Sequence, residues 1–403
     1  MRTFKKRPSE LLIPELLRGN DSRVQLATLQ TLTKLIPLAV FNDSIRRCIP
    51  QILALQGDED EDVQEATVRA LGDFSQHAAF HDDIQSYISK IPELLRGNDS
   101  RGQLATLQTL TNLIPLAVFN DSIRRCIPEI IELLGNSDYR ARSAAILTLT
   151  KLAPDAVLSD SIEKYLPRIF GLLKDEVMDV QEAATRALGD LSQHAAFHNG
   201  IQPYIAQIPQ LLGDSHFRMR SVAHRTLIKL APDAVFGESI KMHLPQMFAL
   251  LKDNDEDVRE AVTVVLGDLS QHAVFYDVIQ PYISRIPELL RDGDREVRSA
   301  TLQALTKLAP NSVFGESIRR HLPRIFALLR DEDDYVRAAA TIALGDLSQH
   351  AAFHDDIQPS YIPWIPKLLW DSGWEVRSAS LQTLTKLAPD GRSPYCCLLC
   401  PVN

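Results

Sequence analysis

Three pairs of histidines are the residues whose type and spacing could do chemistry in this chain. A Gln-His-Ala-Ala-Phe-His segment occurs three times and places two histidines four residues apart in each copy: His77 and His81, His194 and His198, and His350 and His354. Two histidines at this spacing on a helix could bind one metal ion. A fourth copy carries His272 and Tyr276 instead, and no copy contains a glutamate that could act as a base. We therefore interpret these histidines as surface or helix-terminus residues and expect no metal and no other cofactor.

Other signatures of catalysis are also missing from the sequence. Cys396, Cys397 and Cys400 resemble part of a zinc knuckle, but no second pair of ligands accompanies them. The patterns GxxxxGK[ST], GxGxxG and GxSxG do not occur. Cys48 and Cys126 occupy equivalent positions of a repeat, too far apart for a disulfide bond. We therefore expect a protein that is not an enzyme and that resides in a reducing compartment.

The composition is that of a soluble protein with a large apolar core. The 403 residues are 45% hydrophobic and 24% charged, with a net charge of −9. An acidic balance is unfavourable for binding nucleic acid, which requires cations against the phosphates. No apolar run approaches the roughly 20 residues of a membrane-spanning helix, and the N-terminus has no signal-peptide core. We expect protein partners, neither nucleic acid nor a membrane, and a cytoplasmic location with a nuclear one as an addition.

A repeat must position whatever function the chain has. One position, called here the anchor position, recurs at spacings of 39 residues and finally 40: Lys34, Asp73, Asn112, Lys151, Asp190, Lys229, Asp268, Lys307, Asp346 and Lys386. Each repeat reads as a first helix containing a proline, such as residues 318–329, and a second helix with an apolar stripe, such as residues 334–347. A period of this length is typical of a solenoid of helix pairs. We therefore expect an all-α, right-handed alpha-alpha superhelix of about ten helix pairs, with residues 1–390 as one continuous domain and 391–403 as an irregular tail.

Two kinds of repeat alternate along the chain. Lys-type repeats end their second helix in Leu-Thr-Lys-Leu, and Asp-type repeats end it in Leu-Gly-Asp-Leu. Neighbouring helices in a stack lie about 8–10 Å apart, so the anchor residues should form a ladder of ion pairs. The alternation slips once, where Asn112 precedes Lys151 and avoids a like-charge contact. Since an exposed pair contributes only about 0–1 kcal/mol, the ladder should fix register more than stability.

The repeat resembles the HEAT repeat over roughly residues 9–390. The resemblance rests on Leu250–Ala261, with its Asp-Val-Arg sequence, and on Leu266–Leu269. It implies an arginine in the second helix that bonds along the stack, at Arg142, Arg220, Arg259, Arg298, Arg337 and Arg377. Glutamine replaces this arginine in four repeats: Gln25, Gln64, Gln103 and Gln181. Because glutamine cannot form a charged pair, we expect a looser ladder in the N-terminal half.

Two families of this architecture carry similar repeats. The Asp-Val-Arg signature is similar to that of the scaffold subunit of type 2A protein phosphatases. Residues 13–50 and 91–128 are identical except at Val24/Gly102 and Lys34/Asn112, which is similar to the near-identical tandem arrays of fungal sensor proteins. These likenesses imply a non-catalytic protein-binding scaffold. The alternatives are a regulatory scaffold that binds a serine/threonine phosphatase catalytic subunit, and the ligand-recognition array of a larger sensor.

A candidate binding ridge follows one position of the second helices that lies off the apolar stripe. Its apolar members are Leu29, Val68, Leu107, Ile146, Leu302 and Leu381. If they are exposed, they would line a groove for a segment of another protein. The alternative is that they pack sideways against the neighbouring second helix.

Overall fold

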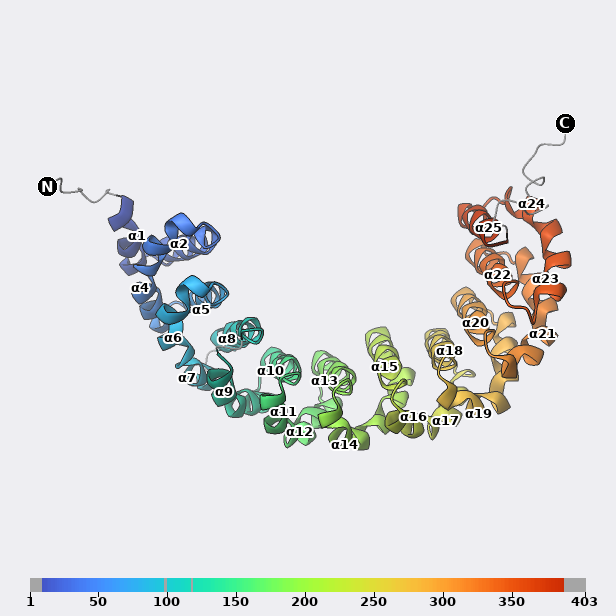
Figure 1. Ribbon diagram of the computed structural model, residues 1–403, viewed down its shortest axis with the longest axis horizontal. Helices are drawn as coiled ribbons and strands as arrows, with labels where there is room; N and C mark the ends of the chain where they lie inside the picture. The colour runs from blue at the N-terminus through green and yellow to red at the C-terminus, as the bar shows by residue number, and fades with distance from the viewer. Residues whose placement is uncertain (1–8, 98–99, 117–118, 388–403) are drawn as a thin grey trace. The chain divides into compact units, whose positions relative to one another are not determined.

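The computed structural model describes residues 9–97, 100–116 and 119–387 (Figure 1). Every regular element in these ranges is helical, so the chain is all-α as predicted. The chain divides into two compact parts, an N-terminal half, Met1–Ile201, and a C-terminal half, Gln202–Asn403. Each half is a stack of helix pairs, which is the fold of an alpha solenoid. That residues 1–390 act as one domain stays a prediction.

The N-terminal half contains five long second helices and a layer of shorter first helices. The second helices are α2 (Ser22–Leu35), α5 (Glu61–Ser75), α8 (Ser100–Leu113), α10 (Tyr139–Leu152) and α13 (Met178–Leu191). The first-helix layer consists of α1 (Ser9–Arg18), α3 (Asn42–Arg46), α4 (Ile49–Ala54), α6 (His81–Ile88), α7 (Ile91–Arg96), α9 (Asn120–Glu132), α11 (Ala156–Glu163), α12 (Leu166–Gly171) and α14 (His198–Ile201). Proline lies in the first turn of α4, α7 and α12, where its missing N–H costs no hydrogen bond.

The C-terminal half repeats this arrangement. Its second helices are α15 (Phe217–Leu230), α18 (Glu256–Leu269), α20 (Arg295–Leu308), α22 (Asp334–Leu347) and α25 (Trp374–Leu387). Its first-helix layer consists of α16 (Ala234–Lys241), α17 (Leu244–Leu250), α19 (Tyr276–Ile279), α21 (Ser312–Ala327), α23 (His354–Tyr361) and α24 (Ile365–Leu368), with 3₁₀ segments such as η11 (Gln280–Arg291) between them. Within each half, taken by itself, the second helices form a row in which each packs on the next.

Aspartates start many of the second helices. Asp333, for example, lies just before α22, and its side chain accepts a hydrogen bond from the backbone N–H of Tyr335 at 2.9 Å. Asp255 caps α18 in the same way, through the N–H of Asp257 at 2.9 Å. The acidic side chains thus satisfy amides that have no partner inside the helix.

A row of buried phenylalanines follows the second helices. These side chains are at most 1% exposed and recur with the repeat: Phe80, Phe119, Phe197, Phe236, Phe275, Phe314 and Phe353. Leu158 takes the same position in the fourth repeat and is equally buried, whereas Phe41 in the first repeat is 37% exposed. The row places one large apolar side chain in the core of each helix pair, where burial stabilises the packing of the two layers.

Glycine allows some second helices to approach each other closely. A Cβ atom on Gly267 of α18 would lie 2.9 Å from the Cα atom of Ala304 on α20. Gly72 and Gly345 meet threonines of the following helix in the same way, Thr109 and Thr383. These glycines precede the anchor aspartates, so an Asp-type repeat packs closely against the Lys-type repeat that follows it. We call α5/α8, α18/α20 and α22/α25 the close junctions.

Replacing Gly267 by alanine should therefore destabilise the protein. The added methyl group would meet backbone atoms of α20 that cannot move aside locally, so we expect a loss of about 1–2 kcal/mol in the free energy of unfolding, despite the better helix propensity of alanine. Gly171→Ala is the control, because nothing lies within 4 Å of a Cβ atom there. Urea unfolding followed by circular dichroism measures both. A Gly267→Ala protein as stable as the control would contradict the close approach.

Candidate protein-binding groove

The structure buries most of the predicted ridge. Leu29, Val68, Leu107, Ile146 and Leu302 are at most 2% exposed, because the neighbouring second helices cover them. The expectation that these five side chains are exposed is therefore wrong, and the alternative of sideways packing is correct, although Leu29 and Leu107 still contribute to the lining of grooves between second helices. Leu381 on α25 differs, since it is 54% exposed. The apolar row is thus an interface between repeats.

The anchor ladder forms at close junctions of the C-terminal half. Lys307 pairs with Asp268 between α20 and α18, and Lys386 pairs with Asp346 between α25 and α22. The Nε2 atom of His224 lies 2.8 Å from the second carboxylate oxygen of Asp268. Burial favours the protonated form of Asp268, but the hydrogen bonds from His224 and Lys307 outweigh it and hold the pKa of that carboxyl below its usual value.

In the N-terminal half the ladder is interrupted. Lys34 and Asp73 are both described, and no ion pair joins them. Burial without such a partner raises the pKa of Asp73. The two members of the next predicted pair belong to different halves of the chain: Asp190 is on α13, and Lys229 is on α15.

The slip in the alternation lies between α8 and α10. The anchor residue of α8 is Asn112, whose side-chain oxygen accepts a hydrogen bond from Gln108 Nε2 at 3.3 Å. The anchor residue of α10 is Lys151, which is exposed and, among the described residues, makes no ion pair. Asp73 on α5 is followed in the next repeat by Asn112, where Asp268 and Asp346 are followed by a lysine that pairs with them. At the slip, Asp73 and Lys151 therefore lie on the surface and do not form an ion pair with each other.

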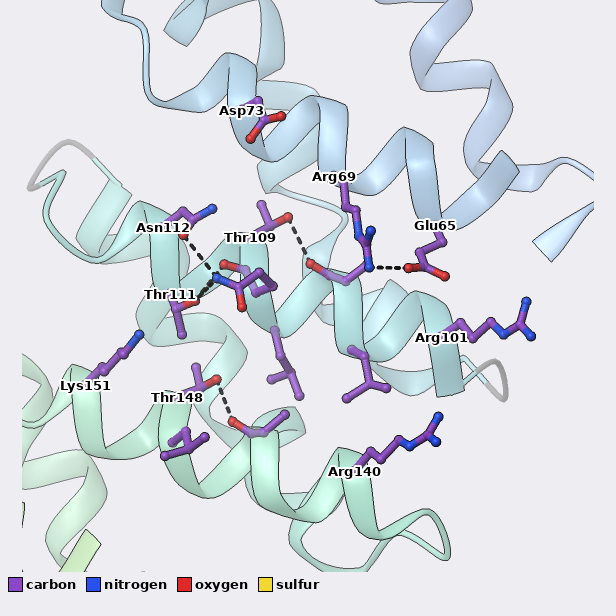
Figure 2. A pocket seen from close by; sticks show the side chains of 16 residues that line it. Glu65, Arg69, Asp73, Arg101, Thr109, Thr111, Asn112, Arg140, Thr148 and Lys151 are labelled. Carbon is purple, nitrogen blue, oxygen red and sulfur yellow. Dashed lines mark hydrogen bonds and ion pairs between the residues drawn. The ribbon is translucent and has the colours of Figure 1, made fainter. Parts of the chain in front are cut away.

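A groove runs over the second helices at this slip. Side chains of α5, α8 and α10 enclose about 670 Å³ (Figure 2). Leu104, Ala144 and Leu147 supply its apolar lining. Arg101 and Arg140 lie at one end, where the helices begin, and Lys151 lies at the other end beside Asn112. We call this the α8/α10 groove.

The α8/α10 groove is locally basic although the chain is acidic. Four cations line it, Arg69, Arg101, Arg140 and Lys151, against two carboxylates, Glu65 and Asp73. Arg69 forms an ion pair with Glu65. The Nη1 atom of Arg101 lies 2.5 Å from the Oδ1 atom of Asp62 on α5. Arg140 lies over the ring of Tyr139, 5.7 Å from its centroid, and no carboxylate of the described residues forms an ion pair with it. The groove thus offers two cations, Arg140 and Lys151, that no acidic side chain neutralises directly.

The arginine ladder implied by the repeat pattern is present. Arg142 reaches into the next repeat, where its Nε and Nη2 atoms bond to the two oxygens of Asp175 at 2.9 and 2.8 Å. Its Nη1 atom also donates to the carbonyl of Asn136 at 2.8 Å. The equivalent rungs that the structure gives are Arg259–Asp292, Arg298–Asp331 and Arg337–Asp371. Arg220 instead reaches Asp257, inside α18, and Arg377 bonds within its own repeat, to the carbonyl of Asp371. The expectation of arginines bonded along the stack is thus confirmed for five of the six predicted positions.

Glutamine keeps only part of this bonding. Gln103 donates to the carbonyl of Gly97 at 2.5 Å, as the arginines do within their own repeat, and accepts one hydrogen bond from Asn136 at 3.1 Å. Gln64 donates to the carbonyl of Asp58 at 2.5 Å. A rung with glutamine therefore lacks the two-point charged contact to the next repeat, which agrees with the expected looser ladder.

The arginine rungs should make the C-terminal half sensitive to acid. Hydrogen bonds from Arg337 hold the pKa of Asp371 below its usual value, against the opposing effect of burial. A lowered folded-state pKa adds stability above the unfolded value of about 3.9, and this stability is lost as the pH falls through the folded pKa. Once the pH is below the folded-state pKa, we expect each such rung to lose about 1–3 kcal/mol of its contribution to the free energy of unfolding. Urea unfolding at pH 7 and near pH 3 checks this, with Asp371→Asn expected to reduce the difference.

The histidine pairs close helix ends. The Nε2 atoms of His81 and His198 lie 3.0 and 2.9 Å from the carbonyl oxygens of Ser75 and Ser192, at the ends of α5 and α13. His354 Nδ1 lies 3.2 Å from the carbonyl of Ser348. This confirms the interpretation as helix-terminus residues, because each second histidine can bond a carbonyl that has no partner inside the helix. In the described ranges, no three His, Cys, Asp or Glu side chains come together as metal ligands would.

The remaining predicted features lie in the core or outside the described residues. Cys48 and Cys126 are buried free thiols, and burial raises the pKa of Cys126 to about 12. Cys396, Cys397 and Cys400 fall outside the described residues. Among the helices that the structure describes, none has the length and apolarity needed to cross a membrane.

Comparisons with known structures support the fold. The chain is similar to an engineered protein, with 19% identity, a TM-score of 0.53, and coverage of 94% of this chain and 99% of the other. It is also similar to the karyopherin Kap121p bound to the extreme C-terminus of the protein phosphatase Cdc14p, at 17% identity and a TM-score of 0.67. Kap121p bound to Pho4p gives 17% identity and a TM-score of 0.66. The chain is covered to 96% in these two matches but spans only 42% of the karyopherin.

Sequence comparison gives the family. No curated protein matches the chain. The pattern of the HEAT repeats matches residues 284–385, and that of the single HEAT repeat matches residues 166–195 and 243–273. These segments contain the arginine rungs Arg259, Arg298 and Arg337 described above. With paired helices stacked in both halves and arginines bonding from one repeat to the next, the chain is a HEAT-repeat protein.

Proposed function

We propose that this protein is a non-catalytic scaffold that binds partner proteins on the exposed face of its second helices. The α8/α10 groove is the observation that carries the proposal. It is built by side chains of three successive repeats, has an apolar lining, and exposes Arg140 and Lys151, with which no carboxylate in the described part of the chain forms an ion pair. A groove of this kind suits an extended segment of another protein better than a small substrate, because it is long, open and without clustered catalytic groups in its lining.

The structural neighbours support a protein ligand in this role. The structures of Kap121p hold a phosphatase C-terminus or the protein Pho4p. Their likeness to this chain is one of fold, so it supports the kind of ligand and does not identify it. The net charge of −9 supports the absence of nucleic acid among the partners.

Two narrower functions remain proposals. A regulatory scaffold of a serine/threonine phosphatase would hold a catalytic subunit on this face, as the Asp-Val-Arg signature suggests. The near-identity of residues 13–50 and 91–128 favours the other, the ligand-recognition array of a larger sensor protein. A cytoplasmic or nuclear location fits either one, and the free buried thiols of Cys48 and Cys126 support a reducing compartment.

The test is capture of partners by the full chain, followed by binding with purified components. We expect at least one captured protein to bind the purified chain at a fixed stoichiometry in isothermal titration calorimetry. Recovery of a phosphatase catalytic subunit would select the phosphatase scaffold among the narrower functions. If no captured protein binds the purified chain directly, the scaffold proposal is wrong.

A further inference from the structure

We propose that the α8/α10 groove binds an acidic segment of a partner protein. This inference rests on the proposed scaffold function and gives it a site and a ligand chemistry. Arg140 and Lys151 are the groups that would contact the carboxylates of the ligand. They lie at opposite ends of the groove (Figure 2). The apolar side chains of Leu104, Ala144 and Leu147 contribute to its lining.

The slip in the alternation produces this basic surface. Four of the six Lys-type repeats carry arginine eleven positions before the anchor, at Arg23, Arg101, Arg140 and Arg218, whereas the last two carry Glu296 and Glu375. Most Asp-type repeats carry aspartate there, at Asp62, Asp179 and Asp257. In regular order each arginine therefore has an acidic repeat beside it. Where two Lys-type repeats adjoin, Arg101 and Arg140 become neighbours, and Lys151 has Asn112 beside it. Cations from two repeats thus line one groove.

The neighbouring groove shows what the regular order gives. A smaller groove of about 310 Å³ lies between α2 and α5, where a Lys-type repeat meets an Asp-type repeat. Its charged lining residues are three carboxylates, Asp62, Glu65 and Asp73, and one cation, Arg69. When the Arg101–Asp62 pair, which spans both grooves, is left out, the charge balance is −1 there and +1 in the α8/α10 groove. An acidic ligand is attracted to the second groove and repelled from the first.

The length of the groove defines the ligand further. Arg140 and Lys151 are eleven residues apart on α10, which corresponds to about 16 Å at the helical rise of 1.5 Å per residue. An extended peptide covers this distance with about five residues. A fitting segment thus has carboxylates at positions about five apart, with small or apolar side chains between them to contact the lining.

Fluorescence anisotropy with synthetic peptides tests the proposal on the full chain. The probe is a labelled peptide with two glutamates at each end and three leucine or alanine residues between them. A matched peptide with lysines in place of the glutamates is the comparison. We expect the acidic peptide to bind and the basic one not to bind. Arg140→Glu with Lys151→Glu should weaken binding at least about tenfold, because both carboxylate contacts become repulsive.

Two controls separate the site from general charge effects. Arg168→Glu makes the same charge change as either single substitution, but on α12 in the other helix layer of the same half, and should leave peptide affinity unchanged. Asn112→Asp supplies Lys151 with the carboxylate that Asp268 gives Lys307, and should weaken binding about threefold. Asn112→Lys restores the residue of the sister copy, Lys34, and should strengthen binding about threefold. Circular dichroism and urea unfolding verify that each variant is folded.

The results that would overturn the inference are specific. Equal binding of the acidic and basic peptides, or unchanged affinity of the Arg140→Glu, Lys151→Glu protein, would contradict it. Displacement of the peptide by inorganic phosphate at equal concentration would show an anion site that does not select a protein segment, and would also contradict it. The proposed scaffold function is tested separately, and it would be contradicted if no captured protein bound the purified chain.

Discussion

Replacing Phe275 by alanine should lower the free energy of unfolding by about 3–5 kcal/mol. The ring is fully buried, and it follows α18 at the point where the chain returns to the first-helix layer. It also meets His272 edge to face at a centroid distance of 6.4 Å. Removing it leaves a cavity between the two helix layers, which the packed helices around it can close only in part. Urea unfolding of the full chain, followed by circular dichroism, measures the loss.

Phe41 is the matched control for this prediction. It occupies the equivalent position of the first repeat, but its side chain is 37% exposed. Phe41→Ala therefore removes less buried surface, and we expect a loss of less than about 1 kcal/mol. Equal losses at the two positions would contradict the assignment of Phe275 to the core of its helix pair.

Asp175→Ala should also destabilise the protein by about 3–5 kcal/mol. The side chains of Arg142 and Asp175 are 9% and 8% exposed, so the substitution leaves a buried guanidinium without its counter-charge. The carboxylate of Asp175 also accepts a hydrogen bond from the N–H of Val177 at 2.8 Å, which is lost as well. The same unfolding measurement gives the size of the effect.

Two further variants decide whether the buried charge causes this loss. Asp62→Ala removes the carboxylate from the exposed Arg101–Asp62 pair and should cost no more than about 1 kcal/mol. Arg142→Gln in the Asp175→Ala protein should restore part of the stability, because glutamine is the residue that four other repeats carry at this position. No recovery in the double variant would mean that the unpaired charge is not the cause.

The fold was predictable because it depends on local patterns that repeat. The anchor spacing, the proline in the first helix and the apolar stripe of the second helix define each helix pair within about 39 residues. The arginine rungs were predictable for the same reason, since a bond such as that from Arg142 to Asp175 recurs between the same two positions of successive repeats. Such contacts follow from the period once the solenoid is recognised.

The candidate ridge could not be judged from the same pattern. Whether Leu107 is exposed depends on how closely the neighbouring second helices approach, and this distance is set between repeats. Gly72 permits a close approach of α8 to α5, where Leu107 is buried. In the sequence alone, the glycine of the Leu-Gly-Asp segment marks only the repeat type.

The α8/α10 groove was missed although its signal is in the sequence. At Asn112 and Lys151 the slip by itself predicts only that a like-charge contact is avoided. The second charged position, at Arg101 and Arg140, slips at the same place, and only the structure shows that both positions line one surface. The charges at one repeat position predict which residues form ion pairs. The net charge of a surface depends on several repeat positions together.

Because of the close junctions, a change in the number of repeats has a different effect when an even number is inserted or lost than when an odd number is. Glycine packing and the anchor ion pair join an Asp-type repeat to the Lys-type repeat after it, so two repeats, about 78 residues, form the structural module. The near-identical segments starting at residues 13 and 91 are also 78 residues apart. Insertion or loss of an even number of repeats preserves the alternation at every junction. Insertion or loss of an odd number makes two repeats of the same type neighbours, so that like charges adjoin there. An array of this kind can therefore acquire a new charged surface by a change in length alone, without any change in the sequence of a repeat.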